Sequence, residues 1–286
     1  MPLFLIRLLT KLSLKHALLT MGCLTALGLT DNIAWAQTMP PPPQLNDLIN
    51  LPKENKVVDK ASPLPLDIRG DAIREAASSY GARGGLAWRT FYIRQELDGR
   101  ARYLDKVFDF RQLLIPAPSG LLMEPPIVSE ALDATVINRQ GQSAALADKV
   151  LNINQNVRIV TVARTWRSYL ERQWGEVTPP PDILRPSNDE EREIWEENVR
   201  AGFAQGTAQA DDIFQADLNK LVADFRGMVR YRSLLTQGMI SPPYTTQVDR
   251  GVTGDGDTMR IGDRALSITN LPKLQTGYKK WQPANR

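Results

Sequence analysis

A long helical pattern between Ser187 and Gln237 constrains the fold of this chain more than any other feature. Its first run of apolar residues is Ile194, Trp195, Val199 and Phe203, and its second run is Phe214, Leu218, Leu221, Phe225 and Met228. Spacings of three and four residues place these side chains on one face of a helix, which has to be buried against another helix. The sequence therefore predicts long packed helices over residues 187–237 that supply the core.

Both ends of this pattern carry residues that start and stop helices. Ser187 and Glu190 have the S-x-x-E spacing of a capping box, directly after Pro186. Gly238 and the proline pair 242–243 follow the last apolar residue of the pattern. We therefore expect the helical region to begin at Ser187 and to end before Gly238.

Further helices are expected upstream. Residues 73–80 place four apolar side chains on one helical face, and a longer apolar pattern runs from Leu86 to Phe108. The glycine-rich stretch "GARGG", residues 81–85, is predicted to break the helix between them, at a corner where two backbones approach closely. Gly202 and Gly206 lie four residues apart and indicate close helix packing or a kink.

The remaining globular sequence favours short strands and loops. The prolines between residues 116 and 126 exclude a helix interior there. Residues 131–153 flank "RQGQ" and predict a hairpin, and residues 244–270 flank a glycine–aspartate turn and predict another. "VRIVTVA" is β-rich, "TWRSYLERQW" resembles a short helix, and "VTPPPDILRP" predicts a loop. The expected class is α+β, a mainly helical body of long packed helices with two short β-hairpin-like segments.

The N-terminal residues have the pattern of an export signal. The pattern leaves three alternatives: release by cleavage after Ala36, lipoprotein processing with a signal over 1–22 and a lipid on Cys23, or an uncleaved anchor. Residues 37–66 are expected to form a proline-rich tether and residues 67–271 one globular domain. Residues 272–286 are expected to be a loose C-terminal tail.

The residue types exclude most catalytic machinery. His16 and Cys23 are the only histidine and cysteine, and either cleavage removes the histidine. Triads with histidine and four-cysteine zinc sites are therefore excluded. The sequence also contains no S-x-x-K and no G-x-S-x-G signature. Asp255 and Asp257 lack the other ligands of a calcium loop and favour a turn. We expect no catalytic residue, no metal site and no cofactor.

Charge argues against nucleic acid as a direct ligand. Without residues 1–36 the chain carries 32 lysines and arginines and 31 acidic residues, a net charge of +1. Proteins that bind nucleic acid directly usually present a strongly basic surface. We therefore expect no direct nucleic-acid binding.

Several long stretches, taken in order, resemble one protein family. They are "SYGARGGLAWRTFYIRQEL", "YLDKVFDFRQLL", "PPIVSEA", "NVRAGFAQGTAQADDIFQADLNKLVADFRGMVRY" and "DRGVTGDGDTMRIGDRALSIT". Together they are similar to the DotC family of type IVB (Dot/Icm-like) secretion systems, and especially to the TraI lipoproteins of IncI-type conjugative plasmids. The resemblance covers about residues 67–271 and is more specific than any short motif.

This resemblance implies a structural role at the outer membrane. Family members are exported lipoproteins of the outer-membrane core complex, where they assemble with DotD-like and DotH-like subunits in an oligomeric ring and help to place the DotH-like subunit. In this sequence Cys23 is the position that corresponds to the lipid anchor. The expected protein is thus a non-enzymatic periplasmic scaffold for conjugal DNA–protein transfer. The alternative that the residues leave open is a periplasmic protein that binds or cleaves glycans or peptides.

Overall fold

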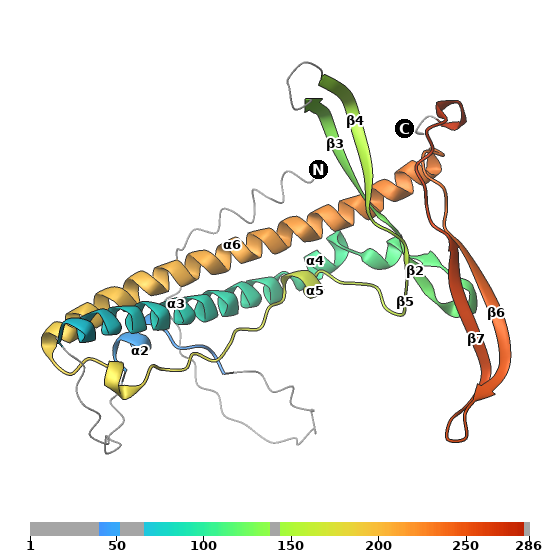
Figure 1. Ribbon diagram of the computed structural model, residues 1–286. Coiled ribbons are helices and arrows are strands. Elements are labelled where there is room, and N and C mark those ends of the chain that lie inside the picture. The colour runs from blue at the N-terminus through green and yellow to red at the C-terminus, as the bar shows by residue number, and fades with distance from the viewer. Residues whose placement is uncertain (1–39, 52–65, 138–143, 283–286) are drawn as a thin grey trace, which may run out of the picture. The chain divides into compact units, whose positions relative to one another are not determined.

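The computed structural model describes residues 40–51, 66–137 and 144–282 (Figure 1). Residues Pro41–Arg286 form one compact unit, and every contact described below lies within it. About 50% of the described residues lie in helices and about 24% in strands of small antiparallel sheets, which confirms the α+β class. In the described part of the chain, we find no helix with the length and hydropathy needed to cross a membrane.

Two long helices dominate this unit. Helix α3 spans Leu66–Gly99, and α6 spans Asp189–Thr236 without interruption. They lie side by side and run in the same direction (Figure 1). Arg69 of α3 binds Glu191 of α6 at 2.7 Å, and Arg89 binds Asp211 at the same distance, so the two helices stay in register along their length.

Glycine lets the backbones of α3 and α6 touch. A Cβ atom added to Gly202 would lie 2.2 Å from the carbonyl oxygen of Ser78, and one added to Gly206 would lie 2.0 Å from that of Ala82. Gly85 of α3 faces the Phe203 carbonyl equally closely. The predicted close approach is confirmed, but the predicted break at residues 81–85 is wrong. These glycines are shielded by packing against α6 and α2, so they do not interrupt the helix.

The apolar core between these helices lies near their N-terminal ends. The short helix α2, Leu45–Ile49, inserts Leu48 among Ile73, Ala77, Trp195 and Val199, and all five side chains are buried. Leu48 also contacts Gly84, where a side chain would clash with it. The described residues before α3 are therefore anchored at this end of the pair.

The N-terminus of α6 differs from the predicted cap by one residue. Asn188 is the N-cap, and its side chain accepts a hydrogen bond from the Glu191 backbone at 2.8 Å. Ser187 instead donates its hydroxyl and backbone hydrogens to the Glu191 carboxylate. Three acidic residues in the first turn add favourable charge at the positive end of the helix dipole. The end before Gly238 agrees with the prediction, since α6 ends at Thr236 and Gly238 has a φ of 67°.

Because α3 and α6 are parallel, the chain has to return along them before α6 begins. Helix α3 is about 51 Å long, and the 17 steps from Glu171 to Asn188 cover about 53 Å in an extended polyproline-like form. Arg172 binds Asp217 of α6, Trp174 contacts Phe91 of α3 edge to face, and the backbone carbonyl of Ile183 accepts a hydrogen bond from Arg69. The proline-rich stretch predicted as a loop is therefore a return segment of matched length, with one 3₁₀ turn, η3 (Asp182–Leu184).

The connection between the helices contains a small sheet and a hairpin. Helix α4 (Ala101–Val107), the turn η1 (Phe110–Leu113), strand β1 (Ile115–Pro116), the turn η2 (Pro118–Gly120) and strand β2 (Leu122–Glu124) follow α3. Strand β5 (Arg158–Val160) completes an antiparallel sheet of order β1-β2-β5. The predicted short helix is reduced to one turn, α5 (Arg167–Leu170).

The two predicted hairpins are present. Strands β3 (Ile127–Ile137) and β4 (Ala144–Gln155) form the first, and β6 (Tyr244–Gly254) and β7 (Met259–Asn270) form the second. The base of the first hairpin packs on α6, where Arg230 donates to the Val128 carbonyl at 2.7 Å and to Glu130 at 3.0 Å. The second hairpin follows α6 directly and touches η2.

The segment expected to be a loose C-terminal tail is held in place over residues 272–282. Leu274 forms an isolated antiparallel bridge with Ile240, and the Gln282 backbone donates to the Gln237 carbonyl at 2.9 Å. A last turn, η4 (Tyr278–Lys280), precedes Trp281, which donates to the Gln275 carbonyl. The free carbonyl groups at the end of α6 provide the physical reason, because they need hydrogen-bond donors.

Candidate functional site

The two residues predicted at the N-terminus lie outside the described part of the chain. Cys23 and Ala36, the candidate lipidation and cleavage positions, both precede Pro40. Asp255 and Asp257 are described, and they form the predicted turn. The Asp255 carboxylate accepts the backbone hydrogens of Asp257 and Thr258 at 3.3 and 2.8 Å. Among the described residues, no group of three or more histidine, cysteine or acidic side chains could hold a metal ion.

A buried ionic cluster joins the small sheet to α6. Glu124 of β2 is only 3% exposed, and its carboxylate binds Arg164 at 2.8 Å and also binds Arg158. Arg164 reaches Asp224 of α6 at 3.1 Å, and the Tyr169 hydroxyl donates to the same carboxylate at 2.8 Å. Arg164 is therefore the bridge between two acidic groups of separate elements.

The contacts of this cluster hold its elements together and do not form a catalytic pair. Burial, reinforced by the neighbouring Asp224 carboxylate, raises the pKa of the Tyr169 hydroxyl far above its usual value, so Tyr169 stays a neutral donor. Both carboxylates bind the same guanidinium, that of Arg164. Glycan cleavage requires a carboxylate pair that faces the sugar from both sides. The Glu124–Asp224 pair does not have that arrangement.

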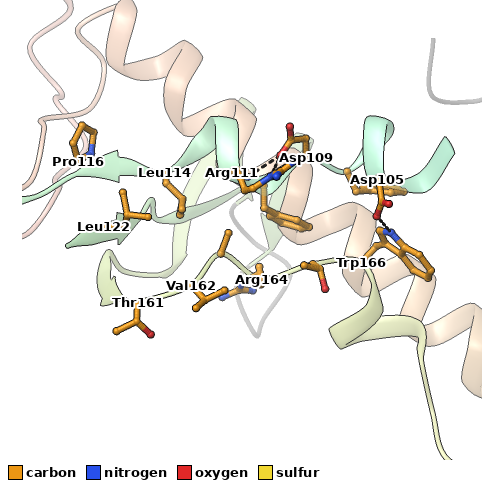
Figure 2. A pocket seen from close by; sticks show the side chains of 14 residues that line it. Asp105, Asp109, Arg111, Leu114, Pro116, Leu122, Thr161, Val162, Arg164 and Trp166 are labelled. Atoms are coloured by element: carbon orange, nitrogen blue, oxygen red, sulfur yellow. Dashed lines mark hydrogen bonds and ion pairs between the residues drawn. The ribbon is translucent and has the colours of Figure 1, made fainter. Parts of the chain in front are cut away.

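An apolar groove of about 720 Å³ lies beside this cluster. Figure 2 shows one wall formed by residues 105–116 and the other formed by residues 161–166, with Leu122 between them. Phe108, Phe110, Leu114 and Trp166 supply much of its apolar lining. Trp166 is held by a hydrogen bond from its indole nitrogen to Asp105 at 2.7 Å. The size and lining fall within the range of binding sites for small molecules or peptide side chains.

The second wall of this groove has an unusual backbone. Residues 161–164 continue from β5, but in the described structure their backbone N–H and C=O groups make no hydrogen bond to another backbone group. The Val162 side chain is 76% exposed. An unpaired extended segment next to apolar side chains is a template for a further strand.

Both hairpins expose apolar side chains to solvent. Leu132 and Leu146 are exposed on the first hairpin, and Val248, Val252, Met259 and Ile261 are exposed on the second. Val252 and Ile261 are directly paired across the second hairpin. A two-stranded hairpin alone is marginally stable in water. Exposed apolar side chains of this kind are typical of surfaces that bind other proteins.

The pairing that builds this region could not be inferred from the sequence. Glu124 stands before two prolines, and Arg164 follows a β-rich run, but neither position indicates its partner. The glycine contact did carry a signal, because Gly81 and Gly85 repeat the four-residue spacing of Gly202 and Gly206. Matching these two spacings would have predicted that the helices touch there.

A family model matches most of the described chain. Residues 67–283 match the model of a family described as "Type IV secretory system, conjugal DNA-protein transfer". A search of curated proteins found no significant match. The matched range includes the helix pair, the ionic cluster, the groove and both hairpins.

Proposed function

The chain belongs to this type IV secretory family for conjugal DNA–protein transfer, and on that premise we propose that it is a non-catalytic scaffold of the outer-membrane core complex. In this role it stands in the periplasm at the outer membrane and assembles as a ring. Its partners are DotD-like and DotH-like subunits, and it helps to place the DotH-like channel subunit. The transferred DNA passes through the whole apparatus and is not bound by this chain.

One structural observation supports the proposal most directly. A tightly packed helix pair carries a sheet and two long hairpins whose apolar side chains are exposed. Buried acidic residues form ion pairs that join separate elements of the described chain. A rigid frame with apolar projections suits a subunit that binds other subunits.

The anchor is the second part of the proposal. We propose that Cys23 carries the lipid and becomes the N-terminus, so that residues 24–39 connect the lipid to the described part of the chain. The intact mass of the mature protein from envelope preparations tests this directly. A diacylglycerol-modified Cys23 supports the anchor, whereas an N-terminus at Gln37 overturns it and leaves a subunit held by protein contacts alone.

The scaffold role is tested in the transfer system that encodes the chain. Deleting its gene should abolish conjugal transfer, and the intact gene supplied separately should restore it. Detergent-solubilised envelopes should yield a large complex that contains this chain and channel subunits. A chain that is always monomeric, and whose removal leaves the channel subunits at the outer membrane, would refute the role.

A further inference from the structure

A single buried side chain attaches the short helix α2 to the frame formed by α3 and α6. Within Leu45–Ile49 only Leu48 is buried, and its side chain lies in one core cluster with Ile73 and Trp195. The Trp195 indole nitrogen also donates a hydrogen bond to the Leu48 carbonyl oxygen at 3.4 Å. Helix α2 therefore depends on one seat, which α3 and α6 form together.

Gly84 of α3 fits this seat to the Leu48 side chain. A Cβ atom added to Gly84 would lie 2.2 Å from the Cδ1 atom of Leu48, and its three nearest atoms all belong to Leu48. At Gly81 and Gly85 the nearest atoms belong instead to the backbone of α6. Glycine inside a helix is unfavourable because it loses much conformational entropy on folding. The contact between α3 and α6 accounts for Gly81 and Gly85, whereas the contact with α2 accounts for Gly84.

Helix α2 is too short to persist once it leaves this seat. Helices of fewer than about 12 residues are marginal in water without tertiary packing. The Asp47 and Leu48 nitrogens bond to the Gln44 carbonyl, and the Asn50 nitrogen bonds to the Asn46 carbonyl, so few backbone hydrogen bonds oppose fraying. Helix α2 is thus folded while Leu48 is docked and unfolded when it is released. A unit of this kind opens at a lower free energy than the centre of α3 and α6.

The seat of α2 lies at the beginning of α3. Leu51 packs against the same cluster as Ile73, which comes seven residues after Leu66, the first residue of α3. Residues 52–65 therefore leave and rejoin the described chain at the same end of the frame. Docked α2 takes residues 40–65 out of the connection between the N-terminal side and the frame.

We propose that α2 is a releasable latch that sets how far the frame can stand from the lipid anchor. This inference rests on the proposed function, since it takes Cys23 as the anchored residue. Cys23 is 17 residues from Pro40 and 43 residues from Leu66, so the connection spans at most about 60 Å with α2 docked and about 150 Å with α2 released. Release of one side chain from its seat lengthens the reach of the frame without unfolding it.

Hydrogen exchange of the full chain in detergent, followed by mass spectrometry, tests whether α2 opens alone. Leu48→Asp places a charge in the apolar seat, and Gly84→Leu fills the seat from the α3 side. Both should raise the exchange rate of the α2 amides by about 10- to 100-fold, the factor for one buried leucine side chain, and leave α3 and α6 protected. Asn46→Asp puts the same carboxylate on an exposed position of α2 and should leave exchange unchanged. Protection of α2 that persists in both variants, or that is lost together with that of α3 and α6, would overturn the latch.

Energy transfer to a membrane measures the reach. The full chain with Ile68→Cys, a 54% exposed position near the start of α3, is labelled with a donor dye and placed in phosphatidylcholine vesicles that contain an acceptor-labelled lipid. Leu48→Asp and Gly84→Leu should lower the energy transfer, and Asn46→Asp should leave it unchanged. An insertion of about ten glycine and serine residues after Asn55 should have no effect while α2 is docked and should lower the energy transfer further in the two released variants. The reach is wrong if release leaves the energy transfer unchanged, or if the insertion acts equally on docked and released chains.

The outcomes separate the latch from the scaffold role. If deletion of the gene abolishes conjugal transfer and Cys23 carries lipid, but α2 stays protected in both variants, the scaffold role stands and the latch is wrong. If α2 opens alone and the reach changes, but conjugal transfer and channel placement do not depend on the chain, the latch is right and the scaffold role is wrong. An N-terminus at Gln37 overturns the anchor and the reach together, and hydrogen exchange then still decides whether α2 opens alone.

Discussion

The contact between α3 and α6 predicts that one substitution has opposite effects at two glycines. In Gly206→Ala, the new Cβ would lie 2.0 Å from the Ala82 carbonyl oxygen and 2.7 Å from the Leu86 nitrogen. Both atoms belong to the backbone of α3, so no side-chain rotation relieves the clash and the helices have to separate. Overpacking costs about 1–3 kcal/mol, and a clash with backbone atoms at 2.0 and 2.7 Å places this case near the upper limit, above the gain of about 1 kcal/mol that alanine brings to a helix.

Gly70→Ala is the matched control. Gly70 also lies inside a long helix, α3, but a Cβ there would have no heavy atom within 4 Å. Only the helix preference acts at this position, so the change should stabilise the protein by about 0.4–1 kcal/mol. The same alanine should therefore raise stability at residue 70 and lower it at residue 206.

Urea unfolding and thermal unfolding of the purified chain, both followed by circular dichroism at the helix band, measure the two changes. Gly206→Ala should lower the melting temperature by about 2–8 °C, and Gly70→Ala should raise it by about 1–3 °C. Equal m-values would show that the unfolded states remain comparable. If Gly206→Ala is neutral or stabilising, the two backbones are not in contact and the described helix pair is wrong.

Three further changes test the other supports of the frame. The hydrogen bond from Arg69 lowers the pKa of Glu191 to about 2. The pair therefore stabilises the folded state by about 1–3 kcal/mol above pH 4.5, and this contribution is lost as the pH falls towards 2. Glu191→Gln should make the free energy of unfolding less dependent on pH in that window, as measured by urea titrations at each pH. Arg164→Met leaves the Glu124 carboxylate buried with only Arg158 as a partner and should lower the free energy of unfolding by about 3–5 kcal/mol. The control Arg200→Met breaks an exposed pair and should lower it by less than about 0.5 kcal/mol in the same urea titrations. Deleting residues 179–181 shortens the return segment by about 9 Å and should separate Arg69 from Glu191, whereas replacing them with three glycines preserves the length and should keep more of the stability.

Elements that obey a simple period were predictable from the sequence. The apolar side chains of residues 194–228 follow the period of a helix, and they lie on the face of α6 that packs against α2, α3, η1 and α5. Both hairpins were predictable because their turn residues separate two β-rich runs. The cap of α6 was displaced by one residue because Asn188 is also a good N-cap, and the side-chain geometry decides between neighbours.

Features that depend on contacts between distant segments were not predictable. Glycine costs about 1 kcal/mol in an isolated helix, which favours a break at residues 81–85. In the folded chain the same glycines allow α6 to approach, and the packing outweighs the local preference. The groove forms where residues 105–116 lie opposite residues 161–166. The periodicity of neither segment predicts that the two face each other.

The parallel direction of α3 and α6 explains why the small sheet, the groove and both hairpins lie at one end of the frame. An antiparallel pair would need only a short connection, but a parallel pair has to carry the chain back by about the full length of a helix. The extended segment before Asn188 returns the chain along α3. The sheet, the groove and both hairpins therefore lie beyond the C-terminal end of α3 and near the C-terminal end of α6. The described residues that lead to the N-terminus pack at the opposite end, against Trp195. Since α6 is about 72 Å long, an anchor joined to the N-terminal side would leave the apolar hairpins free to reach protein partners well away from the tethered end.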